Sequence, residues 1–132
     1  MRMQVRYLGR CRFEAEVRGH RIGCDQPADA GGEDLAPTPP ELLAASLAGC
    51  VGFYVARYCQ QAGIDADGLT VEADWQVGGP PRRIERFVVR VHLPAWEMLP
   101  EGRRRAIERA ATGCLIHNTL SHPPEIAIEV GA

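Results

Sequence analysis

The sequence lacks a strong net charge. Its 132 residues carry a formal net charge of −2 at pH 7, so no general attraction to nucleic acid or to an anionic membrane is expected. A basic run at Arg103–Arg105 lies between Glu101 and Glu108. We interpret it as the solvated face of a helix, because a nucleic-acid footprint needs a broad cationic surface.

Two kinds of apolar segment are also missing. The N-terminus, MRMQVRYLGR, has no apolar core of the kind that a signal peptide requires. The longest apolar stretch, residues 42–56, is interrupted by small and polar residues and falls short of a membrane span. We therefore predict no membrane partner.

Cysteine usage argues against a secreted protein. Five cysteines are an odd number, which does not make a secreted disulfide framework. In a reducing compartment, a disulfide is more often catalytic than structural. We therefore predict a cytoplasmic protein whose cysteines are free or redox-active.

Composition predicts one globular domain over residues 1–132. Hydrophobic residues make up 45% of the chain and charged residues 24%, which is typical of folded proteins. Apolar and charged residues alternate within residues 3–25, and the Gly19-His20 pair predicts a hairpin turn into a strand at residues 21–25. A loop rich in proline, glycine and aspartate follows over residues 26–36.

The clearest helix signal begins at Thr38. Thr38 can cap the helix, Pro39 suits its first turn, and Glu41 completes a capping box. The helix is predicted to run to Gln61 and to end at Gly63. Its first two-thirds are apolar nearly all round, so we expect it to be buried in a core or in a dimer.

The rest of the chain predicts an α+β fold with antiparallel strands around that long helix. Strands are expected at residues 69–77 and 83–93, and a helix from Pro100 to about Gly113. A short helix fits residues 115–121. Ile126, Ile128 and Val130 alternate as a last strand.

Cys50 is a candidate nucleophile in the middle of the long helix. Gly49 and Gly52 beside it leave room for a substrate atom. Its thiolate would need a nearby cation, and Arg57, Arg18 and Arg21 are alternatives that spacing does not separate. A buried cysteine is more often a packing residue, so Cys50 alone does not establish an active site.

Two motifs resemble the OsmC/Ohr family of peroxide-reducing proteins. PTPPELLAASLAGCVGF, ending at Phe53, is similar to the helix that carries the family's reactive cysteine. GCLIHNTL, starting at Gly113, is similar to the motif of its resolving cysteine. The order and separation of the motifs suit the family, and the resemblance covers essentially the whole chain.

The resemblance implies an OsmC-like fold, an intertwined homodimer and reduction of organic hydroperoxides. Cys50 matches the peroxidatic position, which becomes a sulfenic acid, and Cys114 matches the resolving position, which closes a disulfide. The resemblance implies no bound cofactor and an external dithiol reductant, such as a lipoylated protein. Arg18 best matches the arginine that pairs with the reactive thiolate, with Arg21 second.

Some positions depart from the family pattern. In the hydroperoxide-resistance branch a glutamate holds that arginine, and Pro40 occupies its position here. Glu41, one residue later, is a possible supporting carboxylate, but it more naturally serves the capping box. Leu115 and His117 also differ from the second motif, and His117 is a possible supporting residue. The chain therefore resembles the broader OsmC-like relatives.

The expected substrate pocket is apolar, which favours alkyl peroxides over hydrogen peroxide. We expect the central helix to line it with Leu47, Val51, Phe53 and Tyr54. Two other interpretations stay open. One is a binding module for a small apolar molecule or a partner, and the other is a metal protein using Cys114 and His117. Cys11, Cys24 and Cys59 are interpreted as structural.

Overall fold

The computed structural model describes residues 1–131 and forms two compact units. The first unit comprises residues 1–44 and the second begins at Ala45. The fold is α+β with antiparallel sheets, as predicted. A long helix, α1, spans Pro39–Ala62, so it begins in the first unit and continues in the second.

The first unit is a three-stranded antiparallel sheet of β1 (Gln4–Gly9), β2 (Arg12–Val17) and β3 (His20–Cys24). The hairpin turn forms one residue earlier than the predicted Gly19-His20 pair: Arg18 and Gly19 have φ angles of 50° and 80°, and His20 already pairs with Val17. Positive φ at both central residues is the two-residue turn that matches the twist of a hairpin.

One hairpin in this unit was not predicted. β1 and β2 are separated by a turn at Arg10, where the φ angle is 52°, so the strand-like block holds three strands. The alternation of apolar and charged residues over 11–18 continues the pattern of β1. In the sequence only Gly9, which has a φ of 108°, marks the turn between the two strands. Glycine adopts that conformation without a steric penalty, which makes it the signal for the turn.

Asp25 organises the loop that leads from β3 to α1. Its carboxylate is fully buried and accepts hydrogen bonds from the backbone N–H groups of Gln26, Glu33 and Leu35 at 2.7–3.3 Å. Burial alone would raise the pKa of Asp25. The three N–H donors, with the positive charge of Arg12, outweigh burial and hold this pKa below its usual value.

The ends of α1 follow the predicted signals. Thr38 and Glu41 exchange reciprocal hydrogen bonds between side chain and backbone at 3.4 Å, which confirms the capping box. At the other end Gly63 has a φ angle of 68°, and its N–H bonds to Gln60. These two caps explain why the helix stops within one residue of the predicted end.

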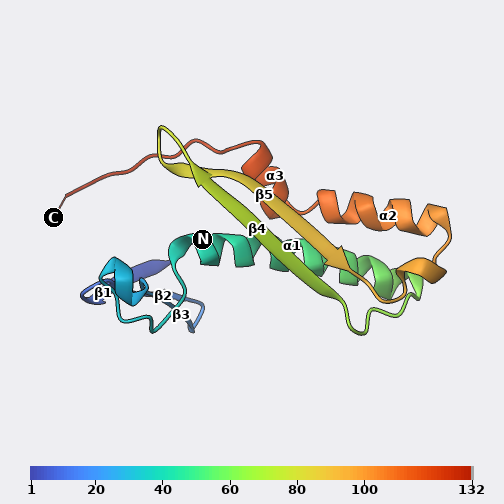
Figure 1. Ribbon diagram of the computed structural model, residues 1–132, viewed down its shortest axis with the longest axis horizontal. Helices are drawn as coiled ribbons and strands as arrows, with labels where there is room; N and C mark the ends of the chain where they lie inside the picture. Colours follow the sequence, from blue (N-terminus) through green and yellow to red (C-terminus); the bar gives the residue numbers. More distant parts are fainter. Residues whose placement is uncertain (132) are drawn as a thin grey trace. The chain divides into compact units, whose positions relative to one another are not determined.

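The second unit packs a β-hairpin and two helices against α1. β4 (Thr70–Gly78) and β5 (Arg83–His92) pair antiparallel, and α2 (Glu101–Thr112) and α3 (Leu115–Ser121) follow. The hairpin runs beside α1, with α2 and α3 near β5 (Figure 1). Val55 and Cys59 of α1 meet Leu93 and Ile107 in a buried core cluster.

The single chain buries one stripe of α1 rather than its whole surface. The buried positions recur at helical spacing: Ala44, Leu47, Val51, Val55 and Cys59. Phe53, on another face, is 58% exposed. Helix α1 is long and apolar enough to cross a membrane, but the core helix of a soluble protein passes the same test. This property alone therefore does not indicate a membrane-spanning helix.

The predicted last strand does not form. Residues 123–131 are irregular, and the side chains of Ile126, Ile128 and Val130 are almost fully exposed. Alternation marks a segment that is able to join a sheet, but a strand needs a hydrogen-bonded neighbour to be stable. Within residues 1–131 this segment has none.

Candidate functional site

Helix α1 places Cys50 at the edge of its buried stripe. Cys50 is half-buried, next to the fully packed Val51. A side chain at Gly49 would meet no other atom, whereas a Cβ at Gly52 would lie 3.2 Å from the Val71 side chain. Gly49 therefore leaves open space near the thiol, and Gly52 serves the close packing of β4 on the helix.

Cys114 lies at the junction of two helices. Gly113 ends α2, and Cys114 is the N-terminal capping residue of α3. Its side chain is completely buried, and its Sγ accepts a hydrogen bond from the His117 backbone N–H at 3.2 Å. A cysteine sulfur thus takes the capping role that serine or aspartate usually fills.

The fold brings Cys50 and Cys114 together. Cys50 packs against the buried cluster of Leu47, Val51 and Cys114, and both thiols are free. Burial is the main reason why the pKa of Cys114 is raised, and the Cys50 side chain, by hydrogen bonding and charge, raises it further. Backbone N–H groups of α3 offset part of this effect. Burial therefore disfavours the thiolate form of Cys114.

An apolar hollow of about 230 Å³ borders this cluster. Its walls come from α1, β5, the end of α2 and α3, and they are formed by Leu47, Val51, Phe87, Val89, Val91, Ala111, Thr112 and His117. The Nε2 atom of His117 lies 3.4 Å from the Ser121 hydroxyl. Its Nδ1 is the one buried side-chain nitrogen or oxygen without a hydrogen-bond partner in residues 1–131.

The four expected pocket residues divide into three groups. Leu47 and Val51 line the hollow. Tyr54 packs against the buried cluster without lining the hollow. Phe53 is largely exposed, on the far side of α1, and its ring contacts that of Tyr54 edge-on at 5.5 Å. At about 100° per residue, Phe53 cannot share a helix face with Val51.

Three of the charged candidates, Arg18, Arg21 and Glu41, lie in the first unit. Arg18 occupies the turn between β2 and β3, and Arg21 on β3 lies 4.0 Å from Glu14. Glu41 is engaged in the capping box. Their proposed roles at the thiolate stay predictions. Arg57, on α1, is exposed.

The other cysteines are separate from the pair. Cys59 is completely buried in the core, where burial raises the pKa of its thiol. Cys11 donates to the carbonyl of Gly31 at 3.5 Å, and Cys24 is half-buried at the end of β3. Across residues 1–131, no three His, Cys, Asp or Glu side chains gather in a group that could hold a metal ion.

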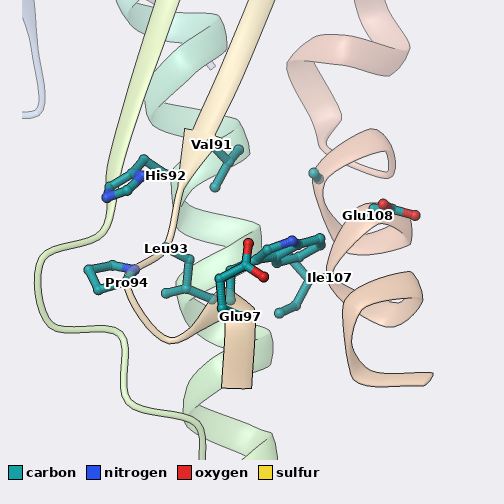
Figure 2. A pocket seen from close by; sticks show the side chains of 9 residues that line it. Val91, His92, Leu93, Pro94, Glu97, Ile107 and Glu108 are labelled. Atoms are coloured by element: carbon teal, nitrogen blue, oxygen red, sulfur yellow. The ribbon is translucent and has the colours of Figure 1, made fainter. Parts of the chain in front are cut away.

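A second hollow was not foreseen from the sequence. It measures about 340 Å³ and is formed mainly by β5, the turn after it and α2, with Val91, Leu93 and Ile107 among its apolar walls (Figure 2). Glu97 and Glu108 also line it. The Arg104 guanidinium lies over the Trp96 ring and donates to the backbone carbonyl of Trp96. The two hollows share Val91 and Ala111, and no cysteine lines either of them; only the first is lined by Leu47 and Val51, which pack with Cys114.

Comparisons with known proteins bear on the family and the fold of this chain. A family model described as OsmC-like protein matches residues 31–129. A structure from Psychrobacter arcticus, named for osmotic stress induction and detoxification, is 25% identical with a TM-score of 0.79 and covers 89% of this chain and 85% of that chain.

Two further structures are similar in fold. An OsmC-like protein of Mycoplasma pneumoniae is 16% identical, with a TM-score of 0.74, over 92% of this chain and 87% of its own. An organic hydroperoxide resistance protein of Legionella pneumophila is 18% identical, with a TM-score of 0.61, over 89% and 86%. A comparison with curated proteins finds no significant match.

Proposed function

The chain belongs to the OsmC-like protein family, and we propose that it is a thiol-dependent peroxidase that reduces organic hydroperoxides to alcohols. The observation that carries this proposal is the contact between two free thiols in unlike environments. Cys50 is half-buried beside open space at Gly49, and Cys114 is fully buried with a raised pKa. In a pair of this kind, the more exposed thiol is suited to attack the peroxide and the buried thiol to form the disulfide afterwards.

The proposed cycle has three steps. The Cys50 thiolate attacks the terminal peroxide oxygen, so an S–O bond forms, the O–O bond breaks and the alcohol leaves as its alkoxide. Cys114 then attacks the sulfur of the Cys50 sulfenic acid, an S–S bond forms and the oxygen leaves as water. An external dithiol, such as a lipoylated protein, reduces the disulfide. No bound cofactor is needed.

The substrate class follows from the hollow beside the pair. Its walls are apolar except for Thr112 and His117, so burial of an organic group there is favourable by about 25 cal/mol per Å². Hydrogen peroxide gains nothing from such walls. We therefore propose alkyl hydroperoxides as substrates, in a role in oxidative stress that the hydroperoxide resistance proteins of similar fold support.

An arginine completes the proposed site. Arg18 is our first choice to stabilise the Cys50 thiolate and Arg21 our second. Pro40 replaces the glutamate that holds this arginine in the hydroperoxide-resistance branch, and Glu41 is committed to its capping box. The arginine is therefore proposed to act without that carboxylate.

We also propose that the protein works in the cytoplasm as an intertwined homodimer. OsmC-like proteins are generally soluble, and this chain leaves apolar side chains exposed on its sheet, on α1 and near its C-terminus: Val5, Tyr7, Phe53, Ile126, Ile128 and Val130. A second copy would bury such a surface.

Sedimentation velocity tests the assembly. We expect a dimer at micromolar concentration, because an obligate interface buries more than about 2,000 Å² and leaves little stable monomer. A well-folded monomer across a hundredfold dilution range would contradict the proposal.

A binding module on the same fold is the alternative. The second hollow supports it, since it is the larger of the two and none of Leu47, Val51 and Cys114, the cluster against which Cys50 packs, lines it. In that case Cys50 would react with peroxide only incidentally, as any exposed thiol does.

Counting thiols separates the two functions. The native protein has five free thiols. We expect one equivalent of cumene hydroperoxide to remove two of them within seconds, through the Cys50–Cys114 disulfide, and dithiothreitol to restore both. A binding module would keep all five over the same interval.

A further inference from the structure

His117 lines the hollow beside the cysteine pair and carries a buried nitrogen without a hydrogen-bond partner in residues 1–131. Two polar side chains line that hollow, Thr112 and His117. The Thr112 hydroxyl is already committed to the backbone carbonyls of Glu108 and Arg109, at 3.0 and 3.3 Å. The Nδ1 atom of His117 is buried and has no partner in the described chain. Buried polar groups are rarely left unpaired, so a ligand is expected to supply the partner.

The position of His117 ties this unused group to the redox pair. Its backbone N–H contacts the Cys114 sulfur at 3.2 Å, and Cys114 in turn contacts Cys50. The other ring nitrogen, Nε2, lies 3.4 Å from the hydroxyl of Ser121, which is exposed. The imidazole therefore belongs to a residue that lines the hollow, and it contacts Ser121, whose side chain is exposed to water.

Peroxide reduction has a step that needs such a group. When a thiolate attacks a hydroperoxide, the electron pair of the O–O bond leaves on the alkoxide, which is strongly basic. The apolar walls of the hollow offer no proton to it. A positioned acid accelerates a step of this kind by about 10²- to 10⁴-fold.

We propose that His117 protonates the leaving alkoxide, an inference that rests on the proposed peroxidase function. The Cys50 thiolate forms an S–O bond with the terminal oxygen, the O–O bond breaks, and the imidazolium proton passes to the alkoxide. The products are the Cys50 sulfenic acid, the alcohol and neutral imidazole. After the alcohol has left, water that enters the hollow restores the proton at Nδ1. In this role His117 is a catalytic residue that contacts the substrate.

Peroxides with different leaving groups test this role. tert-Butyl hydroperoxide releases a basic alkoxide, whereas peracetic acid releases a carboxylate that needs no proton. For His117→Phe, which keeps a ring of similar size, we expect single-turnover oxidation of Cys50 by tert-butyl hydroperoxide to slow about 100-fold. Oxidation by peracetic acid should stay within about threefold of wild type.

Two further variants complete the design. His122→Phe makes the same replacement at an exposed histidine five positions along and should leave both rates unchanged. His117→Gln replaces the phenylalanine variant in the test if that variant does not fold. Glutamine offers an N–H group but no transferable proton, so we expect the same loss of rate with tert-butyl hydroperoxide and not with peracetic acid. Equal losses with both peroxides, or full recovery with glutamine, would overturn the proposal. A wild-type protein that consumes neither peroxide would instead overturn the peroxidase function.

Discussion

The Cys50→Ser protein is expected to consume no organic hydroperoxide above the rate of buffer. A serine hydroxyl is not ionised near neutral pH and is a poor nucleophile toward the O–O bond. Removal of an enzyme nucleophile typically costs many orders of magnitude, so we expect a loss of roughly 10³-fold or more. The measurement is the disappearance of cumene hydroperoxide with dithiothreitol as reductant.

A matched control separates loss of the nucleophile from loss of structure. Cys24→Ser makes the same atomic change at a half-buried cysteine of β3, outside the pair, and should retain full activity. Cys50 is itself half-buried, so the hydroxyl is not expected to unfold the protein. If Cys50→Ser retained a tenth of the activity, another thiol would be the nucleophile and the proposed mechanism would be wrong.

Elements with explicit local signals could be predicted from the sequence. The Thr38–Glu41 capping box and Gly63 define α1 because their effects act within one helical turn. The short helix α3 was expected at its observed bounds, Leu115–Ser121, since Cys114 follows a helix stop and Pro123 prevents continuation. The turn at Arg10 was missed because the apolar alternation continues across it.

Features that depend on distant partners could not be predicted in this way. The alternation of residues 126–130 indicates a strand, yet within residues 1–131 this segment pairs with no strand of either sheet. Packing between β5 and the helices leaves the Nδ1 of His117 without a partner. The same packing forms the second hollow, which Trp96 helps to line. No spacing in the sequence reports which polar atom remains without a partner after packing.

The meeting of Cys50 and Cys114 was expected only through the family resemblance. Spacing alone does not bring a mid-helix thiol to the start of another helix. In the structure, α2 returns along β5 and ends at Gly113, so that Cys114 reaches the cluster of Leu47 and Val51. The contact is therefore a consequence of the tertiary fold.

The Cys114→Ser protein is expected to complete one turnover and then stop. Attack by Cys50 does not need Cys114, but resolution does, so Cys50 should accumulate as sulfenic acid. Excess peroxide should then convert it irreversibly to sulfinic acid. Mass spectrometry of the treated protein, with a sulfenic-acid trap such as dimedone, measures both products.

The structure makes serine a suitable replacement at position 114. The Cys114 sulfur caps α3 by accepting the His117 N–H, and a serine oxygen is a stronger acceptor in the same place. Cys114→Ala is the matched control: it removes the cap as well as the thiol and should cost about 1 kcal/mol of stability, while it leaves the same single turnover. An unmodified Cys50 in both treated variants would end the case for catalysis, and continued turnover by either one would show that Cys114 is not the resolving residue.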